Sequence, residues 1–409
     1  MNKQEKLIAA LLGALMVGWM VHTQREAAKQ AKVQAETRAA ASAAGPVEPI
    51  VKEAALIAPT SGRGAPPPVV EEPAVSAPET PEEVAELASD DLTIAVSSHG
   101  AVIKRATLGR FNTLPGKPGD KNPPVTFDFS GAPALELTGL PGLAPNAAYT
   151  VTRDPSGRTV TLTASAAQGF SVIRRIELLN DYRLKVTDTF KNGGDTVLAL
   201  GTNGVGIGCM AKGASKNEML SADSLPSVDG AKVRHWGSEK TTKPYLAGSA
   251  AGGCRGSAPA VGLPDRVTIP VHEPQTWVAI KSRFFVTAIL SSETSCGFTL
   301  VAARDLKKET YSLSSLAAHV RYPGRVLNQG DSLTRDYTLF IGPKKLSFLQ
   351  AMGHELDAVM EFGFFAWFCK LLVPTLNFFH RLIPNYGIAI ILLTFLVRII
   401  FWPLTHKST

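Results

Sequence analysis

A largely apolar run near the C-terminal end, residues 386–404, contains one charged residue, Arg398. At a helical rise of about 1.5 Å per residue, a run of this length spans roughly 28 Å, close to the hydrocarbon thickness of a bilayer. The run therefore predicts a transmembrane helix. A guanidinium group keeps its charge, so Arg398 must either extend to the membrane interface or belong to a functional site. The spacing alone favours neither reading.

The segment before this run, residues 362–383, has its polar residues on one helical face. Lys370, Asn377 and Arg381 are spaced by seven and four residues, Pro374 falls in the same register, and aromatic residues cover the rest. This pattern predicts an amphipathic helix that lies in the membrane interface and bends at the proline. A second transmembrane helix is the alternative, although charged residues at mid-membrane would be costly.

The N-terminal end carries a membrane-targeting pattern, in which Lys3 and Lys6 precede a short apolar stretch, residues 7–21. We predict an uncleaved signal anchor over residues 1–24, since no small-residue cleavage site directly follows Val21. A removed secretory signal is the alternative. Residues 25–90 are rich in Pro, Ala and Glu, which predicts a disordered linker because such a composition cannot bury a core.

Residues 91–342 consist of short alternating segments separated by turn residues, which predicts one large antiparallel β-sandwich. Residues 201–264 lack this alternation and are rich in Gly and Ser, so we expect long loops at one edge. Their Gly204-x-Gly206-x-Gly208 run favours a glycine-rich turn over a dinucleotide fingerprint, because the third glycine is misplaced. The strand candidates are residues 92–96, 101–108, 149–153, 159–163, 171–178, 183–190, 277–290, 298–302 and 333–340.

Composition excludes several function classes. The net charge is +7, but the basic residues do not form the dense run or aromatic signature of a nucleic-acid-binding protein. The sequence has no CxxC pair and no nucleophile motif, and its histidines lack ligand spacing, so we expect no enzyme activity, cofactor or metal. Whether Cys209, Cys254 and Cys296 form a disulfide is left open by the sequence.

The C-terminal stretch 385–405, with the aromatic amphipathic segment before it, resembles the second transmembrane region of the bacterial YidC membrane protein insertases. Three shorter stretches, residues 99–103, 277–285 and 342–344, are each similar to a pattern of the same family. The resemblance implies an anchor (1–24), a linker (25–90), a periplasmic β-sandwich (91–342), a membrane-proximal helical segment (343–385) and the start of an insertase membrane core (386–409).

The resemblance also implies a function. Members of this family are multi-pass proteins of the inner membrane with a cytoplasmic N-terminus, and they aid the insertion, folding and assembly of integral membrane proteins through a hydrophilic groove. The groove arginine of the family corresponds to Arg398. The implied partners are nascent membrane proteins, the lipid bilayer and the Sec translocon. The family continues with further transmembrane helices beyond the position of Thr409, so we expect this sequence to be an incomplete copy. The alternative function is a membrane-tethered periplasmic module that binds glycans or envelope proteins.

Overall fold

The computed structural model describes residues 80–113, 122–212, 219–237, 264–306, 312–363 and 366–405. These residues fall into two compact units: a β unit that ends at Glu361 and a helical unit that begins at Phe362. The predicted anchor, residues 1–24, and residues 25–79 of the predicted linker lie outside the described residues.

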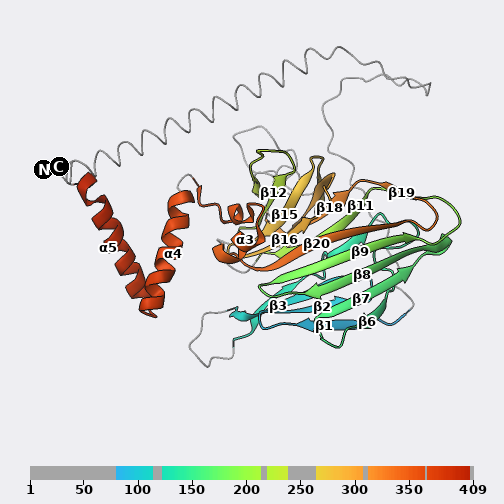
Figure 1. Cartoon of the computed structure of the whole chain (residues 1–409), viewed down its shortest axis with the longest axis horizontal. Coiled ribbons are helices and arrows are strands. Elements are labelled where there is room, and N and C mark those ends of the chain that lie inside the picture. Colours follow the sequence, from blue (N-terminus) through green and yellow to red (C-terminus); the bar gives the residue numbers. More distant parts are fainter. Residues whose placement is uncertain are drawn as a thin grey trace, which may run out of the picture. The chain divides into compact units, whose positions relative to one another are not determined.

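One layer of the β unit is a nine-stranded antiparallel sheet, which we call the first sheet (Figure 1). In spatial order its strands are β1 (Val84–Ala88), β2 (Leu92–Ser97), β3 (Val102–Asn112), β5 (Ala134–Thr138), β11 (Asn203–Ala211), β18 (Leu313–Tyr322), β17 (Gly297–Arg304) and β14 (Arg266–Val271), and β4 (Pro124–Asp128) also pairs with β3. Strand β1 lies inside the range predicted as linker. It forms because Ala85 and Leu87 alternate with exposed residues and are buried.

The other layer, the second sheet, is also nine-stranded and antiparallel (Figure 1). In spatial order its strands are β13 (Arg234–Gly237), β12 (Ser221–Pro226), β15 (Gln275–Lys281), β16 (Phe285–Ser291), β20 (Ser332–Pro343), β9 (Arg183–Asn192), β8 (Phe170–Leu178), β7 (Thr159–Ser165) and β6 (Thr150–Arg153). A short 3-10 turn, η1 (Ala167–Gly169), precedes β8, and a separate pair is formed by β10 (Leu198–Leu200) and β19 (Arg325–Leu327).

Buried apolar residues from both sheets form one core, so the predicted antiparallel β-sandwich is confirmed. A buried ion pair also joins the sheets. Arg174 of β8 binds Asp188 of β9 through two nitrogens, at 2.7 and 2.6 Å, and donates to the backbone carbonyls of Ala101, in the turn before β3, and Leu135, in β5 of the first sheet. Because every partner is fixed by a strand or a turn, the guanidinium is satisfied inside the core despite its desolvation.

The predicted hairpins at residues 92–108, 149–163 and 171–190 are confirmed by β2–β3, β6–β7 and β8–β9. The candidate at 277–290 is in fact two strands, β15 and β16, joined by a tight turn.

The glycine-rich turn predicted at Gly204, Gly206 and Gly208 is wrong, because these residues lie in the buried strand β11. An added Cβ would come within 2.7 Å of Thr138 Oγ1 at Gly204 and within 2.8 Å of a Phe129 ring carbon at Gly208. Glycine at these positions therefore lets neighbouring segments approach closely. Because glycines occupy positions where apolar side chains would otherwise recur, the sequence of β11 lacks the hydrophobic alternation that marks a strand.

Helices follow the second sheet. In the β unit these are α3 (Leu346–Met352) and the 3-10 helix η2 (Leu356–Met360), whereas α4 (Ala366–Leu382) and α5 (Tyr386–Thr405) form the helical unit. The predicted amphipathic and C-terminal segments are thus helical, and the Asn385 side chain caps α5 by accepting the Gly387 N–H at 2.8 Å. Among the described residues, none of the helices combines the length and apolar character needed to cross a bilayer. The predicted transmembrane role of residues 386–404 is not confirmed.

Candidate functional site

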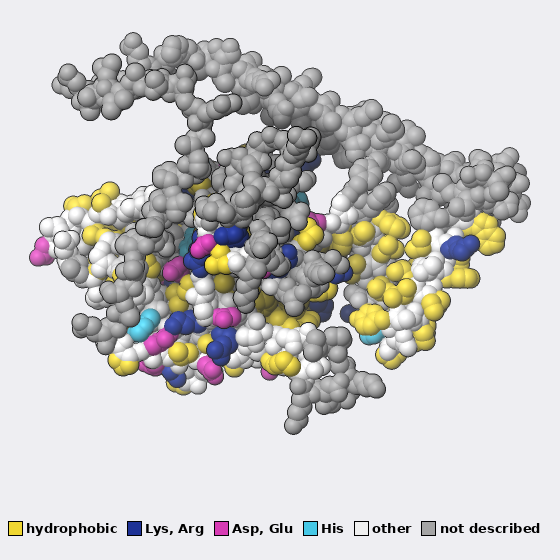
Figure 2. Space-filling view, turned by 180° about the vertical axis from the view of Figure 1, so that it is seen from behind, with side chains coloured by type: hydrophobic (Ala, Val, Ile, Leu, Met, Phe, Trp, Pro, Cys, Tyr) yellow, Lys and Arg dark blue, Asp and Glu magenta, His cyan; other side chains and the backbone are white. Residues whose placement is uncertain are grey.

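Arg398, the residue predicted to contact substrate, lies in the C-terminal half of α5. Its side chain is exposed, and it forms no hydrogen bond or ion pair with any residue that the structure describes. Hydrophobic side chains cover much of the surface of α4 and α5 (Figure 2). Lys370, Asn377 and Arg381 of α4 are all exposed, as expected for one polar face. The role of Arg398 stays a prediction.

A second group of charged side chains lies at the end of the β unit, and the sequence analysis did not predict it. We call Asp223, His235, Lys281 and Glu361 the exit cluster, because Glu361 is the last residue before the helical unit. Asp223 of β12 lies directly opposite His235 of β13, and β15 on the other side of β12 contributes Lys281. Glu361 directly follows η2. The sheet thus holds three of the four side chains and the segment after α3 brings the fourth.

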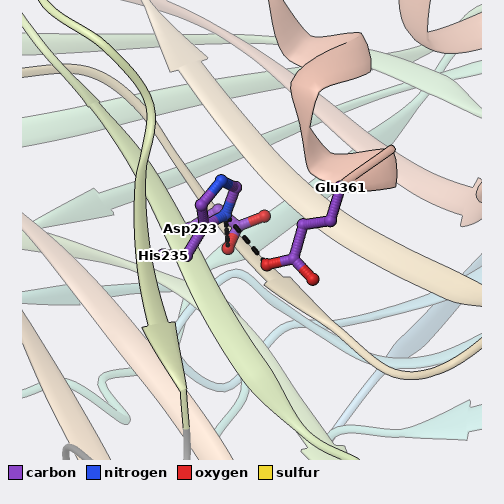
Figure 3. A group of neighbouring side chains, drawn as sticks. All are labelled: Asp223, His235 and Glu361. Atoms are coloured by element: carbon purple, nitrogen blue, oxygen red, sulfur yellow. Dashed lines mark hydrogen bonds and ion pairs between the residues drawn. The ribbon is translucent and has the colours of Figure 1, made fainter. Parts of the chain in front are cut away.

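The histidine joins the two carboxylates of the exit cluster (Figure 3). His235 Nδ1 lies 3.0 Å from Asp223 Oδ1 and 3.0 Å from Glu361 Oε1. The Lys281 ammonium also binds both carboxylates: it contacts Asp223 Oδ2 and lies 3.1 Å from Glu361 Oε1. It donates a further hydrogen bond of 3.1 Å to the Val359 carbonyl. A lysine and a histidine together therefore fasten η2 and Glu361 to the second sheet.

The members of the exit cluster differ in burial. Asp223 is fully buried and Lys281 nearly so, whereas His235 and Glu361 are partly exposed. The hydrogen bond to Asp223 raises the pKa of His235, against the opposing effect of burial. Burial and the nearby Lys281 charge lower the pKa of Lys344, which lies close by. The protonated histidine balances the cluster at two positive and two negative charges, so its charge state controls how strongly Glu361 is held.

The cluster also has donor atoms suited to a divalent cation, because one atom from each of Asp223, His235 and Glu361 lies within 4.8 Å of the others. The Lys281 ammonium, however, already contacts both carboxylates. A metal ion between them would face this positive charge at short range, so the geometry favours an ionic latch over a metal site.

Apolar and aromatic contacts along β15 also hold residues 349–359 against the second sheet. The indole nitrogen of Trp277 donates to the His354 carbonyl at 2.8 Å, and Leu349, Leu356 and Val359 are buried against the sheet. Sequence reasoning treated His235 as one of several scattered histidines and missed Asp223. The available signal was Lys281 itself, a charged residue at the end of an apolar strand, which needs a buried partner.

The fold places the chain among proteins with a large antiparallel β-sandwich that continues into apolar helices. Within that class, residues 267–374 match the YidC periplasmic domain family. The membrane protein insertase YidC of Geotalea uraniireducens (strain Rf4) is 39% identical over 132 residues, which cover 32% of this chain and 24% of that protein. The YidC of Geobacter sulfurreducens is 36% identical over 137 residues, 34% of this chain and 24% of that protein.

These matches confirm the resemblance to YidC over this region, and they span about a quarter of the length of the relatives. The names of the relatives also agree with the prediction that the chain is not an enzyme. Among solved structures, a putative aldose 1-epimerase from Escherichia coli K12 aligns with a TM-score of 0.40 and 12% identity, covering 64% of this chain and 99% of that one. A galactose mutarotase related enzyme from Lactobacillus acidophilus aligns with a TM-score of 0.40 and 10% identity, covering 63% of this chain and 97% of that one.

Proposed function

We propose that this chain is part of a membrane protein insertase of the bacterial inner membrane, with its β-sandwich in the periplasm and its N-terminus in the cytoplasm. The observation that carries the proposal is the match of residues 267–374 to the YidC periplasmic domain, together with relatives named as insertases. Its partners are nascent integral membrane proteins and the lipid bilayer. Contact with the Sec translocon stays a prediction.

In this proposal α4 lies in the membrane interface and α5 enters the bilayer as part of the groove. The support is the exposure of their apolar side chains, among them Phe378, Ile391 and Phe395. Arg398 offers a fixed positive charge to acidic or polar parts of an incoming segment. Such a charge lowers the free energy needed to move a carboxylate from water toward the membrane interior, and no covalent step or cofactor is involved.

The exit cluster has a supporting role in this function. It fixes Glu361, and α4 begins at Ala366 only five residues later. The cluster thus fixes the point at which the chain leaves the β-sandwich. We therefore assign the cluster to positioning, and Arg398 to substrate contact.

The test of the proposal is an insertion assay in proteoliposomes. The chain is extended with the further transmembrane helices that the resemblance to the family implies, and protease protection of a single-span substrate with an acidic N-terminal tail is measured. We expect Arg398→Ala to reduce insertion at least about tenfold, because a charge-assisted contact contributes roughly 1.5–3 kcal/mol and each 1.4 kcal/mol is a factor of about ten. Arg398→Lys should retain most of the activity. Undiminished insertion by the alanine variant would remove Arg398 from the mechanism.

A further inference from the structure

The turn between β15 and β16 exposes an aromatic ring at the end of the β unit. The Phe284 side chain is 62% exposed, and the Arg283 guanidinium lies 5.2 Å from its ring centroid. The next residue, Phe285, behaves in the opposite way and packs edge-on against Phe111 and Phe127. Packing therefore accounts for Phe285, whereas most of the Phe284 side chain is exposed and the Arg283 guanidinium is its recorded ring contact.

Basic residues lie next to this turn. The Lys344 N–H donates to the Phe284 carbonyl at 2.8 Å, which places Lys344 and Lys345 beside the turn. Lys345 is exposed, and its ammonium lies 4.6 Å from the Phe348 ring centroid. No described carboxylate forms a salt bridge with Arg283, Lys344 or Lys345. We call Arg283, Phe284, Lys344 and Lys345 the turn surface: one exposed aromatic residue and the three basic residues of the turn and its backbone neighbour.

The turn surface lies at the same end of the domain as the exit cluster. Lys281 is two residues before Arg283, and its ammonium contacts Val359 and Glu361. The chain therefore leaves the β unit next to this surface and reaches α4 within a few residues. The five residue steps from Glu361 to Ala366 extend over about 18 Å at most. A membrane-bound α4 thus limits how far the turn surface can lie from the lipid headgroups.

We propose that the turn surface binds the anionic headgroups of the bilayer, with the Phe284 ring at the interface and the basic groups on lipid phosphates. The inference rests on the proposed function, because it takes α4 to be bound at the membrane. An aromatic ring flanked by lysine and arginine suits this boundary, since the ring prefers the headgroup level and each basic group is attracted to the negative surface.

The test is photo-crosslinking of the full chain in vesicles of phosphatidylethanolamine and radiolabelled phosphatidylglycerol. The photoreactive amino acid p-benzoylphenylalanine replaces Phe284, and two further samples carry it at matched exposed positions. Val326 is 66% exposed and belongs to β19, a strand that lies away from α3 (Figure 1), whereas Phe378 of α4 is 57% exposed. We expect lipid adducts at positions 284 and 378 and background labelling at 326.

The three positions separate the outcomes. Labelling at 378 without labelling at 284 would overturn the turn-surface proposal while leaving a membrane-bound α4 intact. The absence of lipid labelling at both 284 and 378 would reject the membrane placement of α4 as well. A protein adduct at 284 in place of a lipid adduct would also overturn the lipid assignment. Arg283→Gln and Lys345→Gln should each lower the lipid adduct at 284 about fivefold, as expected for the loss of one basic group.

Discussion

Two sets of ion pairs in the β unit differ in what they hold together. Arg174 and Asp188 are both fully buried and join the two sheets through strands that are themselves fixed. In the exit cluster only Asp223 and Lys281 are buried, while the partly exposed His235 and Glu361 connect the sheet to a short segment beyond α3. The first set can break only when the sandwich opens. We expect the second to be able to release residues 354–361 while the sandwich stays folded, because these residues lie outside the strands.

The first set therefore has a purely structural role in the sandwich, which we call the scaffold, whereas the second holds a segment that can detach, which we call the latch. A fully buried pair resists a change of pH and salt because water does not reach it, whereas a half-exposed pair is screened and can be titrated. The two sets should therefore respond differently to substitution, and the responses can be ranked by size.

The largest effect is expected from Arg174→Met, which leaves the Asp188 carboxylate buried without a partner. Removing one member of a buried pair costs about 3–5 kcal/mol, and the free energy of unfolding in urea should fall by this amount. The control is Arg175→Met, since Arg175 is the next residue and is exposed. Much of the loss should return in the double variant Arg174→Met with Asp188→Leu. Equal stability of the two single variants would contradict the scaffold role.

The next effect is expected from Lys281→Met. This change removes the ammonium from Asp223, Glu361 and the Val359 carbonyl, at a cost of about 3 kcal/mol. Unlike Arg174→Met, it should act locally, so hydrogen exchange measured by mass spectrometry should show residues 354–361 losing protection before the sheets do. Lys185→Met, at an exposed lysine of β9, is the matched control. Unchanged protection of residues 354–361 in the Lys281 variant would argue against the latch.

The sequence predicted the sandwich because alternation is a local signal, and β2, β8 and β9 display it over many residues. Strand prediction failed where the residue types in a strand are set by contacts with segments distant in sequence. In β11 the glycines serve the close approach of residues distant in sequence, such as Phe129 and Thr138, so no local pattern records the strand. The turn within residues 277–290 was missed for a related reason, because buried apolar residues continue on both sides of it.

The site was only partly predictable. Arg398 stands out because one charge interrupts an apolar run, which is visible without any structure. In the exit cluster, Lys281 at the end of the apolar strand β15 signals only that a buried partner is needed, not which residue it is. Asp223 and Lys281 are 58 residues apart in the chain, and they meet only because β12 and β15 pair. Strand pairing between distant segments is a property of the whole sheet, so the partner of Lys281 cannot be read from its neighbours.

The smallest expected effect is a pH dependence of the latch, set by His235. Its folded-state pKa is raised above the ordinary value of 6.5, mainly by the hydrogen bond to Asp223. The protonated imidazole therefore stabilises the folded state fully below about pH 6.5, and this contribution is lost as the pH rises through the raised folded value. Because His235 is partly exposed, solvent screening should keep the change below about 1 kcal/mol.

Hydrogen exchange of residues 354–361 in the full chain, followed from mildly acidic to mildly alkaline pH and corrected for the intrinsic exchange rate, measures this contribution. Protection should fall across the range, since the groups that face the imidazole are the carboxylates of Asp223 and Glu361 and the Lys281 ammonium. Deprotonation removes the attraction to both carboxylates and leaves Lys281 to hold Glu361 alone. His235→Gln should abolish the slope, whereas His272→Gln, at an exposed histidine near Arg321, should retain it. A slope that persists in His235→Gln would assign the titration to another group and leave the exit cluster a static contact like that of Arg174.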